Sequence, residues 1–353
     1  MHLKVLPARY VWHMNKRALV IRYGAFGDHL ILTPVMARLK ELGYYVIFNT
    51  NKRGEEVFKN NPCVDEYIMH DESMSIDKLP DHWEKLQKDI PHDKFINFSE
   101  SLECNVALHP IQPAYNYTKA ERRAIADKNY YDVTEQLAGL DDCKKLPELF
   151  FTPFEIQEAR AHLKENKFNI LWQLSGSAKQ KVYPWTDYVI GEALKNYHDI
   201  HFITTGDEKC QILETLNDSE ITNLSGKIPV RIAMALTGLV QLVVSPDTGI
   251  LHASGCYSTP KIGLLGHTTI NNITKYFIND YSIEAECACA PCFRLIYDHD
   301  IQCPVDVITK AAWCQSEGIK PERVYGRITD VIKNSGKERT YINLPQEMSN
   351  MRG

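Results

Sequence analysis

Short apolar runs alternate with segments of helical periodicity along most of the chain. In the first part, Leu30, Val35, Leu39 and Leu42 recur at helical spacing, and Gly43 follows them as a stop signal. Four apolar runs there predict buried strands at 17–24, 44–50, 64–70 and 94–100. The segment 51–62 predicts a short helix and a turn. Residues 71–93 are polar and helical at best, and residues 101–130 are predicted to be loop-rich.

The same alternation restarts after residue 150. Apolar runs predict strands at 168–175, 199–206, 221–226, 239–246 and 259–266. Helical periodicity predicts helices at 154–166, 184–197, 207–217, 229–238, 248–257 and 321–334. The chain therefore predicts an α/β protein with two Rossmann-like units. In parallel α/β sheets ligands bind at the carboxyl ends of the strands. Because two such units would face each other, we expect the ligand site in a cleft between the domains.

Domain boundaries follow from this pattern and from the length of 353 residues, which exceeds one ordinary core. We predict an N-terminal arm at 1–16, an N-terminal domain at 17–152 and a C-terminal domain at 153–335. The C-terminal domain includes a cysteine-rich segment at 287–314. Residues 336–353 are predicted to form a polar tail.

Charge and composition narrow the classes of partner. The formal net charge is −5 and no basic tract is present, which disfavours a bulk electrostatic grip on nucleic acid. No apolar run approaches the ~18 residues of a membrane span, although peripheral membrane contact stays open. The N-terminus lacks the apolar core of a signal peptide. We therefore expect a cytoplasmic protein whose ten cysteines are reduced.

The first chemistry-bearing stretch is 22-RYGAFGDHLILTP-34. Gly24 and Gly27 stand between a strand and a helix, but their spacing is not G-x-G-x-x-G, and the next strand ends without an acidic residue. A hydride-transfer enzyme is therefore disfavoured. Asp28 has two interpretations, as a helix N-cap or as a carboxylate base that faces the cleft.

The second stretch, 174-LSGSAKQKVYPW-185, also lies between a strand and a helix. Its hydroxyls, small residues and positive charges suit a phosphate. The alternative is a solvated polar loop with ordinary surface lysines. The residues concerned are Ser175, Gly176, Ser177, Lys179 and Lys181.

The third stretch is 245-SPDTGILHASG-255. If Asp247 ends a strand, Thr248 and Gly249 open a helix whose free N–H groups favour an anion. His252 lies on the same helix face as Thr248. A carboxylate would repel that anion, so we expect Asp247 to accept hydrogen bonds from sugar hydroxyls. The alternative is a capped helix with a buried histidine.

Taken together, the three loops predict a nucleotide-sugar glycosyltransferase. Two other classes stay open: a protein that binds a nucleotide sugar without catalysis, and a nucleotide-sugar epimerase. Turnover with an acceptor separates the transferase from the binder, and product formed from the donor alone would indicate the epimerase.

These motifs resemble glycosyltransferase family 9, the ADP-heptose:lipopolysaccharide heptosyltransferases, over most of residues 17–335. The most specific block is 243–269, with Asp247-Thr248-Gly249, His252, Gly266 and Thr268. The other blocks are Gly27-Asp28 with Thr33-Pro34, and Lys181-Val182-Tyr183-Pro184, where the family has Trp in place of Tyr. The resemblance implies the GT-B fold, in which two Rossmann-like domains face a cleft and a final helix packs back across the domains.

The resemblance also implies roles. Asp28 would be the general base, and Lys181 and Ser175 would neutralise the leaving diphosphate. The phosphate would lie on Thr248 and Gly249, and the donor sugar would be read by Asp247 and His252. Gly176 and Ser177 complete the donor loop. Ile228 would pack on the nucleobase of the donor, and Glu208 is a candidate for binding its ribose. The implied reaction is inverting and requires no cofactor.

The acceptor side is less clear from the sequence. Gly27, Arg122 and Arg123 are candidates for acceptor binding, although the two arginines could equally be solvated. Residues 97–110 do not match the lipopolysaccharide-specific enzymes. The acceptor could be a glycan, a modified nucleobase or a protein side chain, and the donor sugar need not be heptose.

The segment 287–314 holds five of the ten cysteines. Cys289 and Cys292 have zinc-knuckle spacing, and Cys303 and Cys314 could complete a four-sulfur structural zinc site. The gaps after Cys292 are unlike a second C-x-x-C, so a set of reduced structural thiols is the alternative.

Overall fold

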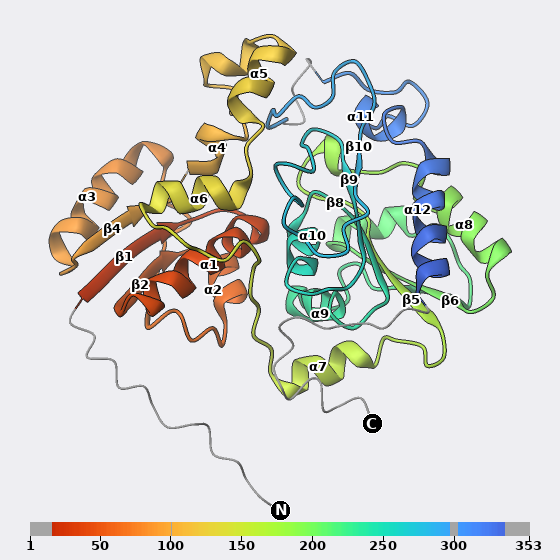
Figure 1. Cartoon of the computed structure of the whole chain (residues 1–353), viewed down its shortest axis with the longest axis horizontal. Coiled ribbons are helices and arrows are strands. Elements are labelled where there is room, and N and C mark those ends of the chain that lie inside the picture. Colours follow the sequence, from red (N-terminus) through yellow and green to blue (C-terminus); the bar gives the residue numbers. More distant parts are fainter. Residues whose placement is uncertain (1–15, 100, 297–302, 336–353) are drawn as a thin grey trace, which may run out of the picture.

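The computed structural model describes residues 16–99, 101–296 and 303–335. The predicted arm, except Lys16, and the predicted tail lie outside these residues. Two α/β units lie side by side (Figure 1). We call the sheet β1–β4 with helices α1–α6 the N-terminal unit, and the sheet β5–β10 with α7–α12 the C-terminal unit. Within the described ranges, no helix is long and apolar enough to cross a membrane.

The N-terminal sheet is parallel, with strand order β3-β2-β1-β4. Its central strand β1 is buried from Ala18 to Arg22, as expected for a parallel strand covered on both faces. All four predicted strands are present, with shorter third and fourth strands. Their bounds are β1 Lys16–Arg22, β2 Tyr44–Thr50, β3 Glu66–Met69 and β4 Lys94–Asn97.

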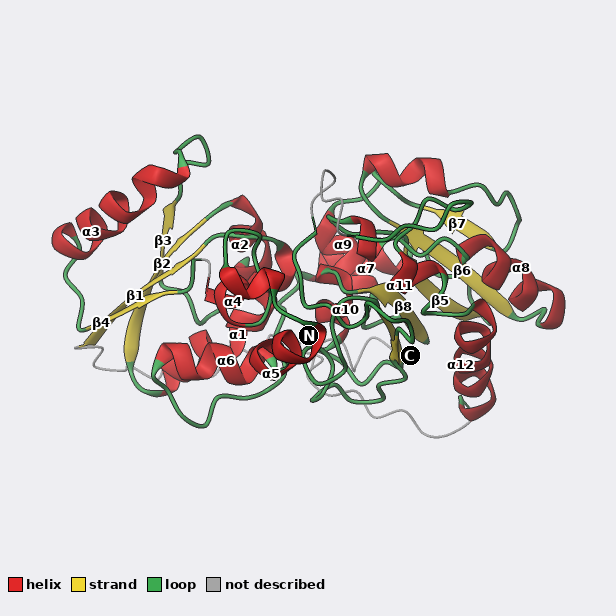
Figure 2. Ribbon diagram, turned by 90° about the horizontal axis from the view of Figure 1, so that it is seen from above, coloured by secondary structure: helices red, strands yellow, loops and turns green. Residues whose placement is uncertain are grey.

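The C-terminal sheet is also parallel, with strand order β10-β9-β8-β5-β6-β7. The two sheets are separate layers in the view from above (Figure 2). The five predicted strands are confirmed, and a short edge strand, β10, was not predicted. The bounds are β5 Phe168–Gln173, β6 Ile200–Thr205, β7 Ile221–Asn223, β8 Leu242–Pro246, β9 Lys261–Leu265 and β10 Ile283–Glu284.

The strand order reverses beside β1 in one sheet and beside β5 in the other. β1 lies between β2 and β4, and β5 lies between β6 and β8. Ligands of open α/β sheets bind outside the carboxyl ends of strands at such reversal points. The segments that follow β1, β5 and β8 carry Asp28, Ser175 and Asp247, so all three predicted stretches lie at or beside a reversal point.

The helices follow the predicted pattern in most of the chain. The final helix has the predicted bounds, whereas the segment 207–217 forms only a short 3-10 helix, η4 Glu208–Leu213. The α-helices are α1 Phe26–Glu41, α2 Lys52–Phe58, α3 Leu79–Asp89, α4 Ser101–Asn105, α5 Lys119–Ala126, α6 Tyr130–Ala138, α7 Pro153–Arg160, α8 Thr186–Asn196, α9 Val230–Leu236, α10 Gly249–Ser254, α11 Trp313–Ser316 and α12 Pro321–Asn334.

Helix α1 contains a proline, Pro34, in its interior. A proline has no N–H, and the carbonyl of the residue four positions earlier therefore loses its helical partner. Here the Thr33 hydroxyl donates to that carbonyl, Leu30 O, at 2.8 Å. This hydrogen bond lets a proline stand in a helix that is otherwise buried against the sheet.

The prediction of a loop-rich segment at 101–130 was wrong. The segment contains α4, the 3-10 helix η2 Pro113–Asn116 and α5. Helix α5 starts with a capping box, in which Thr118 Oγ1 accepts from the Glu121 N–H at 3.3 Å and the Glu121 carboxylate accepts from the Thr118 N–H at 2.8 Å. The pattern Thr-x-x-Glu is a known signal for a helix start and could have been recognised in the sequence. The helix that it begins is only short.

The segment from Val106 to Asp127 follows the N-terminal sheet in the chain but docks on the C-terminal unit. Leu108 N–H donates to Phe293 O at 2.8 Å, and Leu295 N–H donates back to Leu108 O at 3.0 Å. Leu108, Tyr115 and Ala126 form a buried cluster with Phe293 and Ile296. In Figure 1, α5 accordingly lies beside the loop that precedes α11.

A second apolar cluster joins the two units at the centre of the molecule. Ile31 of α1 and Tyr130 of α6 belong to the same buried cluster as Leu251 of α10 and Leu265 of β9. Asn129 at the start of α6 donates to Asn271 O at 2.9 Å, and Asn272 donates to Ala126 O at 2.9 Å. The two units are therefore held in one arrangement by both apolar and polar contacts.

A buried ion pair of the C-terminal unit lies next to the segment that connects the two units, residues 139–152. Glu155 of α7 accepts from Arg231 of α9, with an Nη2–Oε2 distance of 3.1 Å. Arg231 also donates to Glu56 O of the N-terminal unit at 2.7 Å and to Phe150 O at 2.6 Å. Its guanidinium thus ties α9, the connection and α2 together.

The last helix differs from the GT-B expectation. Helix α12 buries Val324, Ile328 and Val331 in the core of the C-terminal unit, next to α8. Figure 1 shows it on the outer side of this unit, away from the N-terminal sheet. The described part of the chain therefore ends within the C-terminal unit.

The ion pair at the connection should make stability fall in acid. Burial raises the pKa of Glu155, but Arg231 and Thr152 outweigh it and lower this pKa from 4.5 to about 2. A carboxyl with a depressed folded pKa stabilises the fold above its unfolded pKa and loses that contribution as pH falls. We expect the free energy of unfolding, measured by urea denaturation, to decline between about pH 4.5 and 2. A Glu155→Gln variant should show a flatter decline over this window.

Candidate active site

Asp28 lies at the third position of α1, and the N-cap is Ala25. The interpretation of Asp28 as the N-cap was therefore wrong. Its carboxylate reaches back and accepts from the Ala25 N–H at 2.7 Å. Gly24 makes this turn possible, because its φ is +138° and a Cβ there would stand 2.6 Å from Asp28 Oδ2.

Arg22 is the main partner of Asp28. It ends β1, is 1% exposed, and its Nη2 lies 2.9 Å from Asp28 Oδ1. Burial raises the pKa of Asp28, but Arg22 and the Ala25 N–H outweigh burial and hold it below its usual range. Asp28 is therefore ionised at neutral pH and available to accept a proton, although the nearby positive charge weakens it as a base.

Asp247 is the centre of a buried charged cluster at the end of β8. Its carboxylate lies 3.4 Å from Lys181 Nζ, 3.4 Å from His252 Nε2 and 3.6 Å from His267 Nε2. Burial raises the pKa of Asp247, but Lys181 and the histidines outweigh this effect and lower it strongly. The negative charge that would repel a phosphate is thus partly balanced by Lys181.

Helix α10 begins where the sequence predicted. Thr248 is its N-cap and accepts from the Ile250 N–H at 3.3 Å, so Gly249 is the first helical residue. Thr248 also contacts Ser245 Oγ at 2.9 Å through its hydroxyl. The free N–H groups of the first turn lie beside the Asp247 cluster.

The loop after β5 packs against the same helix start. A Cβ on Gly176 would stand 2.9 Å from Lys181 Cδ and 3.0 Å from Thr248 Cγ2. Ser175 Oγ contacts Cys210 Sγ at 3.0 Å, and Ser177 is exposed. The loop at 174–181 and the helix at 248–254 therefore form one surface, with Lys181 between them.

The Asp28 loop meets this surface from the N-terminal unit. A Cβ on Gly27 would stand 2.9 Å from His252 Cδ2, and a Cβ on Gly249 would stand 2.7 Å from Phe26 Cβ. Lys181 is close enough to lower the pKa of Asp28. The structure thus brings the residues of all three predicted loops together at the junction of the two units.

Several buried polar atoms near this junction have no hydrogen-bond partner among the described residues. They are His252 Nδ1, His267 Nδ1 and Thr268 Oγ1. Burial and Lys181 lower the pKa of His267 to about 4, so its ring is neutral and offers one donor and one acceptor. Buried polar atoms without partners are costly, and a bound polar ligand would satisfy them.

Two other predicted donor residues, Glu208 and Ile228, are not brought to this junction by any described contact. Glu208 is exposed at the start of η4, and a Cβ on Gly226 would stand 2.8 Å from its Cα. Ile228 is partly buried and packs against a hydrophobic core cluster that includes Ile232 and Leu224. No described contact links either side chain to the Asp247 cluster.

The two arginines proposed for an acceptor have separate surroundings. Arg122 is 6% exposed, and it donates to Cys292 O at 2.9 Å and to Tyr117 O. It therefore holds α5 on the cysteine segment and is not solvated. Arg123 is exposed and pairs with Asp127 at 3.1 Å.

Four residues of the site were not singled out from the sequence. Arg22, Glu103, Tyr130 and His267 surround Asp28 and Asp247. A charged residue inside the apolar run 18-ALVIR-22 is a signal that could have identified Arg22, because buried charges require partners. Burial and the charges of Asp247, Asp28 and Glu103 raise the pKa of Tyr130, so its phenol stays protonated.

The cysteine segment does not form a metal site in the described residues. Nowhere in the ranges 16–99, 101–296 and 303–335 do three His, Cys, Asp or Glu side chains converge to hold a metal ion. Cys287 Sγ and Cys289 Sγ lie 3.5 Å apart, and Cys314 is buried. Phe293 N–H donates to His267 O at 2.8 Å, so the segment directly supports the loop that carries His267.

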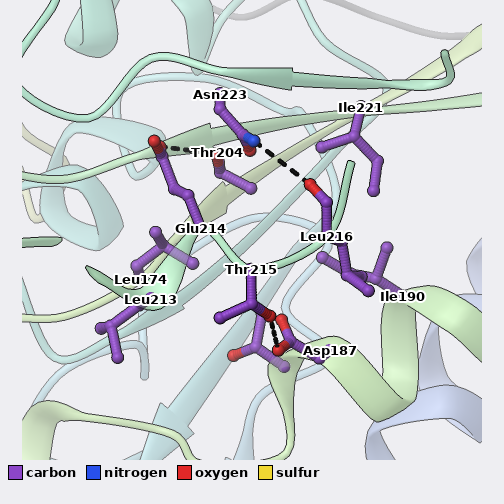
Figure 3. Close-up of a pocket in the computed structure, with 11 residues that line it drawn as sticks. Leu174, Asp187, Ile190, Thr204, Leu213, Glu214, Thr215, Leu216, Ile221 and Asn223 are labelled. Atoms are coloured by element: carbon purple, nitrogen blue, oxygen red, sulfur yellow. Dashed lines mark hydrogen bonds between the residues drawn. The ribbon is translucent and has the colours of Figure 1, made fainter. Parts of the chain in front are cut away.

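A small pocket of about 200 Å³ lies elsewhere in the C-terminal unit (Figure 3). It is formed by α8, the ends of β6 and β7 and residues 213–216. Asn223 donates to Leu216 O at 3.3 Å, and Thr204 donates to Glu214 at 2.9 Å across it. None of the predicted site residues lines this pocket. The pocket is therefore separate from the junction at Asp28 and Asp247.

Comparison with known proteins places this arrangement in a family. The model of glycosyltransferase family 9 (heptosyltransferase) matches residues 112–298, more than half of the chain. Lipooligosaccharide heptosyltransferase 2 of Campylobacter jejuni is 23% identical over 256 residues, which cover 67% of this chain and 74% of that protein.

Solved structures share the fold. A family 9 glycosyl transferase from Veillonella parvula has a TM-score of 0.62 and 15% identity, and covers 90% of this chain and 98% of its own. E. coli ADP-heptose lps heptosyltransferase II has a TM-score of 0.58 and 15% identity, with 91% and 100% covered. An iron-containing dodecameric glycosyltransferase from enterotoxigenic E. coli has a TM-score of 0.60 and 11% identity, with 91% and 77% covered. The chain is therefore a glycosyltransferase with the GT-B fold, and it belongs to glycosyltransferase family 9.

Proposed function

We propose that this enzyme transfers heptose or a related sugar from an ADP-linked donor to an acceptor hydroxyl, with inversion. The observation that carries the proposal is the contact of the Asp28 loop with the Lys181–Asp247–His252 cluster, through Gly27 and Gly249. This contact brings a carboxylate from one unit to Lys181 and the start of α10 in the other. The similarity to an E. coli ADP-heptose heptosyltransferase supports the choice of donor.

In the proposed reaction, Asp28 takes the proton of the acceptor hydroxyl as that oxygen attacks the anomeric carbon. The bond between this carbon and the diphosphate oxygen breaks, and the nucleoside diphosphate leaves with the electron pair. Attack from the side opposite the leaving group inverts the anomeric centre. Asp28 suits the base because it is ionised at neutral pH and belongs to the unit opposite the donor loops.

The leaving diphosphate would be stabilised by Lys181 and by the first turn of α10. A lysine and free N–H groups at a helix start supply positive charge where the leaving group gains negative charge. We propose that these groups, with Ser175, Gly176 and Ser177, perform this task and that the reaction needs no added cofactor. Glu208 and Ile228 remain proposals for binding of the nucleoside.

The donor sugar would lie against Asp247 and His252. Asp247 is surrounded by donors and carries lone pairs that a sugar hydroxyl can use. The unpartnered His252 Nδ1 and Thr268 Oγ1 support a polar ligand at this point. Gly27 and the exposed Arg123 remain proposals for the acceptor side.

Lys181→Met should lower turnover by about 100-fold, which is the order of the loss in kcat when one group that stabilises charge in a transition state is removed. It should also weaken binding of ADP, because Asp247 would face the diphosphate without its main counter-charge. The measurement is release of ADP from ADP-heptose, together with the ADP-induced shift in melting temperature.

Lys179→Met provides the matched control, since it removes the same charge two residues earlier. We expect it to leave turnover within about threefold of the unmodified enzyme, a change of less than 1 kcal/mol in the barrier. Equal losses in the two variants would contradict a specific role for Lys181 at the leaving group.

Metal analysis would separate the two interpretations of Cys289, Cys292, Cys303 and Cys314. The described geometry does not fit a metal centre, yet one similar solved structure is iron-containing. Zinc or iron at one equivalent per chain, lost on replacing Cys314 by serine, would support a structural centre. Metal-free folded protein with titratable thiols would support reduced structural cysteines.

A further inference from the structure

The guanidinium of Arg22 contacts two carboxylates, and one of them is the proposed base, Asp28. Arg22 Nη1 and Nη2 donate to the two oxygens of Glu103 at 3.1 and 3.0 Å, and Nη2 also lies 2.9 Å from Asp28. Nη1 makes a further hydrogen bond to Phe98 O at 2.6 Å. The guanidinium is therefore fixed on three sides, and its side chain is 2% exposed.

The fixed geometry comes from the fold of two neighbouring strands. Arg22 ends β1 and Phe98 follows β4, the strand paired with β1 at the reversal point of the sheet. Glu103 lies on α4, directly after β4, and its side chain is 26% exposed. Glu103 and Asp28 thus share Nη2 of Arg22, and Glu103 is partly accessible from solvent.

Glu103 places a second carboxylate on the guanidinium that pairs with Asp28, in addition to the Lys181–Asp247 pair nearby. Burial raises the pKa of Asp28, whereas Arg22 and Lys181 lower it. Tyr130 is neutral, and burial and Arg22 lower the pKa of His29 to about 4, so neither ring adds a full charge at neutral pH. Among the described groups that contact Arg22, Glu103 is the carboxylate that competes with Asp28 for its positive charge.

We propose that Glu103 is a positioning residue that holds Arg22 in place and divides its charge, and so keeps Asp28 basic enough to accept the proton. Glu103 acts through Arg22 and does not itself touch the reacting atoms. The chemical part of this inference rests on the proposed function, in which Asp28 is the base. The charge network itself can be tested without any substrate.

The substrate-free test is a double-mutant cycle of unfolding free energies by urea denaturation, with Glu103→Gln, Asp28→Asn and both changes together. Each single variant leaves Arg22 with one carboxylate, whereas the double variant leaves a buried guanidinium with none. We expect the double variant to lose more stability than the two single variants summed. Additive losses would overturn the inference.

The catalytic test uses release of ADP from ADP-heptose with water as the acceptor. Glu103→Gln should lower kcat about threefold and leave the KM for ADP-heptose unchanged, because Asp28 becomes a weaker base. The acid limb of the pH profile should move to lower pH by about one unit, as expected when a negative charge a few ångströms away is removed. In the Asp28→Asn background the same change should have no further effect on kcat.

Glu84→Gln, on the exposed face of α3, is the matched control and should leave both kcat and the acid limb unchanged. A Glu103→Gln variant that lowers kcat equally with and without Asp28 would show a merely structural role and overturn the inference. If the double-mutant cycle is non-additive but the unmodified enzyme releases no ADP from ADP-heptose, the network stands and the proposed donor is wrong.

Discussion

Asp28→Asn should lower sugar transfer by about 1,000-fold, the middle of the range for loss of a positioned general base. The amide has almost the shape of the carboxylate, and its oxygen can still accept from the Ala25 N–H, so the turn at Gly24 should persist. Arg22 keeps its two hydrogen bonds to Glu103 in this variant. The loss should therefore be chemical and not structural.

The measurement pairs turnover with donor binding. Release of ADP should fall, while the ADP-induced shift in melting temperature should stay as in the unmodified enzyme, because the proposed diphosphate site belongs to the other unit. Asp81→Asn, an exposed change on α3, should alter neither quantity. Full turnover in Asp28→Asn would remove Asp28 from the mechanism.

Arg231→Met should lower the free energy of unfolding by about 3–5 kcal/mol, the typical loss when one partner of a buried ion pair is removed. The side chain of Arg231 is 3% exposed, and that of Glu155 is 11% exposed. Without the guanidinium, Glu155 is left buried and the carbonyls of Glu56 and Phe150 lose their donor. Urea denaturation provides the measurement.

Two companion variants test the cause of this loss. Arg327→Met removes an exposed arginine that lies 3.8 Å from Asp330, and should change stability by about 0.5 kcal/mol or less. The double change Arg231→Met with Glu155→Leu should recover part of the loss, because no unpaired charge remains. A loss in Arg231→Met no larger than that in Arg327→Met would show that the buried pair does not hold the units together.

Local patterns in the sequence were sufficient for most of the secondary structure. The strands in front of Asp28, Ser175 and Asp247 are apolar runs, and α12 extends over the predicted residues because Pro321 starts a helix of regular amphipathic period. The start of α10 at Thr248 followed from an N-cap residue and a glycine. Each of these features depends on neighbours within a few positions.

The features that were missed depend on residues far apart in the chain. Arg22 and Glu103 are 81 residues apart, and Arg122 and Cys292 are 170 apart, so no local pattern pairs them. The helices at 101–126 are short, and their stability comes from docking on the other unit more than from their own periodicity. His267 lies between Gly266 and Thr268, and no pattern in the sequence marked it as part of the site.

The docking of residues 106–127 on residues 287–296 has a consequence for the folding of the chain. A fragment that ends at residue 152 would carry Leu108, Tyr115 and Ala126 without the surface that covers them. A fragment that starts at residue 153 would expose Phe293 and Ile296. Neither half is then a self-sufficient folding unit, although each contains a complete sheet. The two halves should melt as a single cooperative block, and expressing them separately should yield aggregation-prone polypeptides.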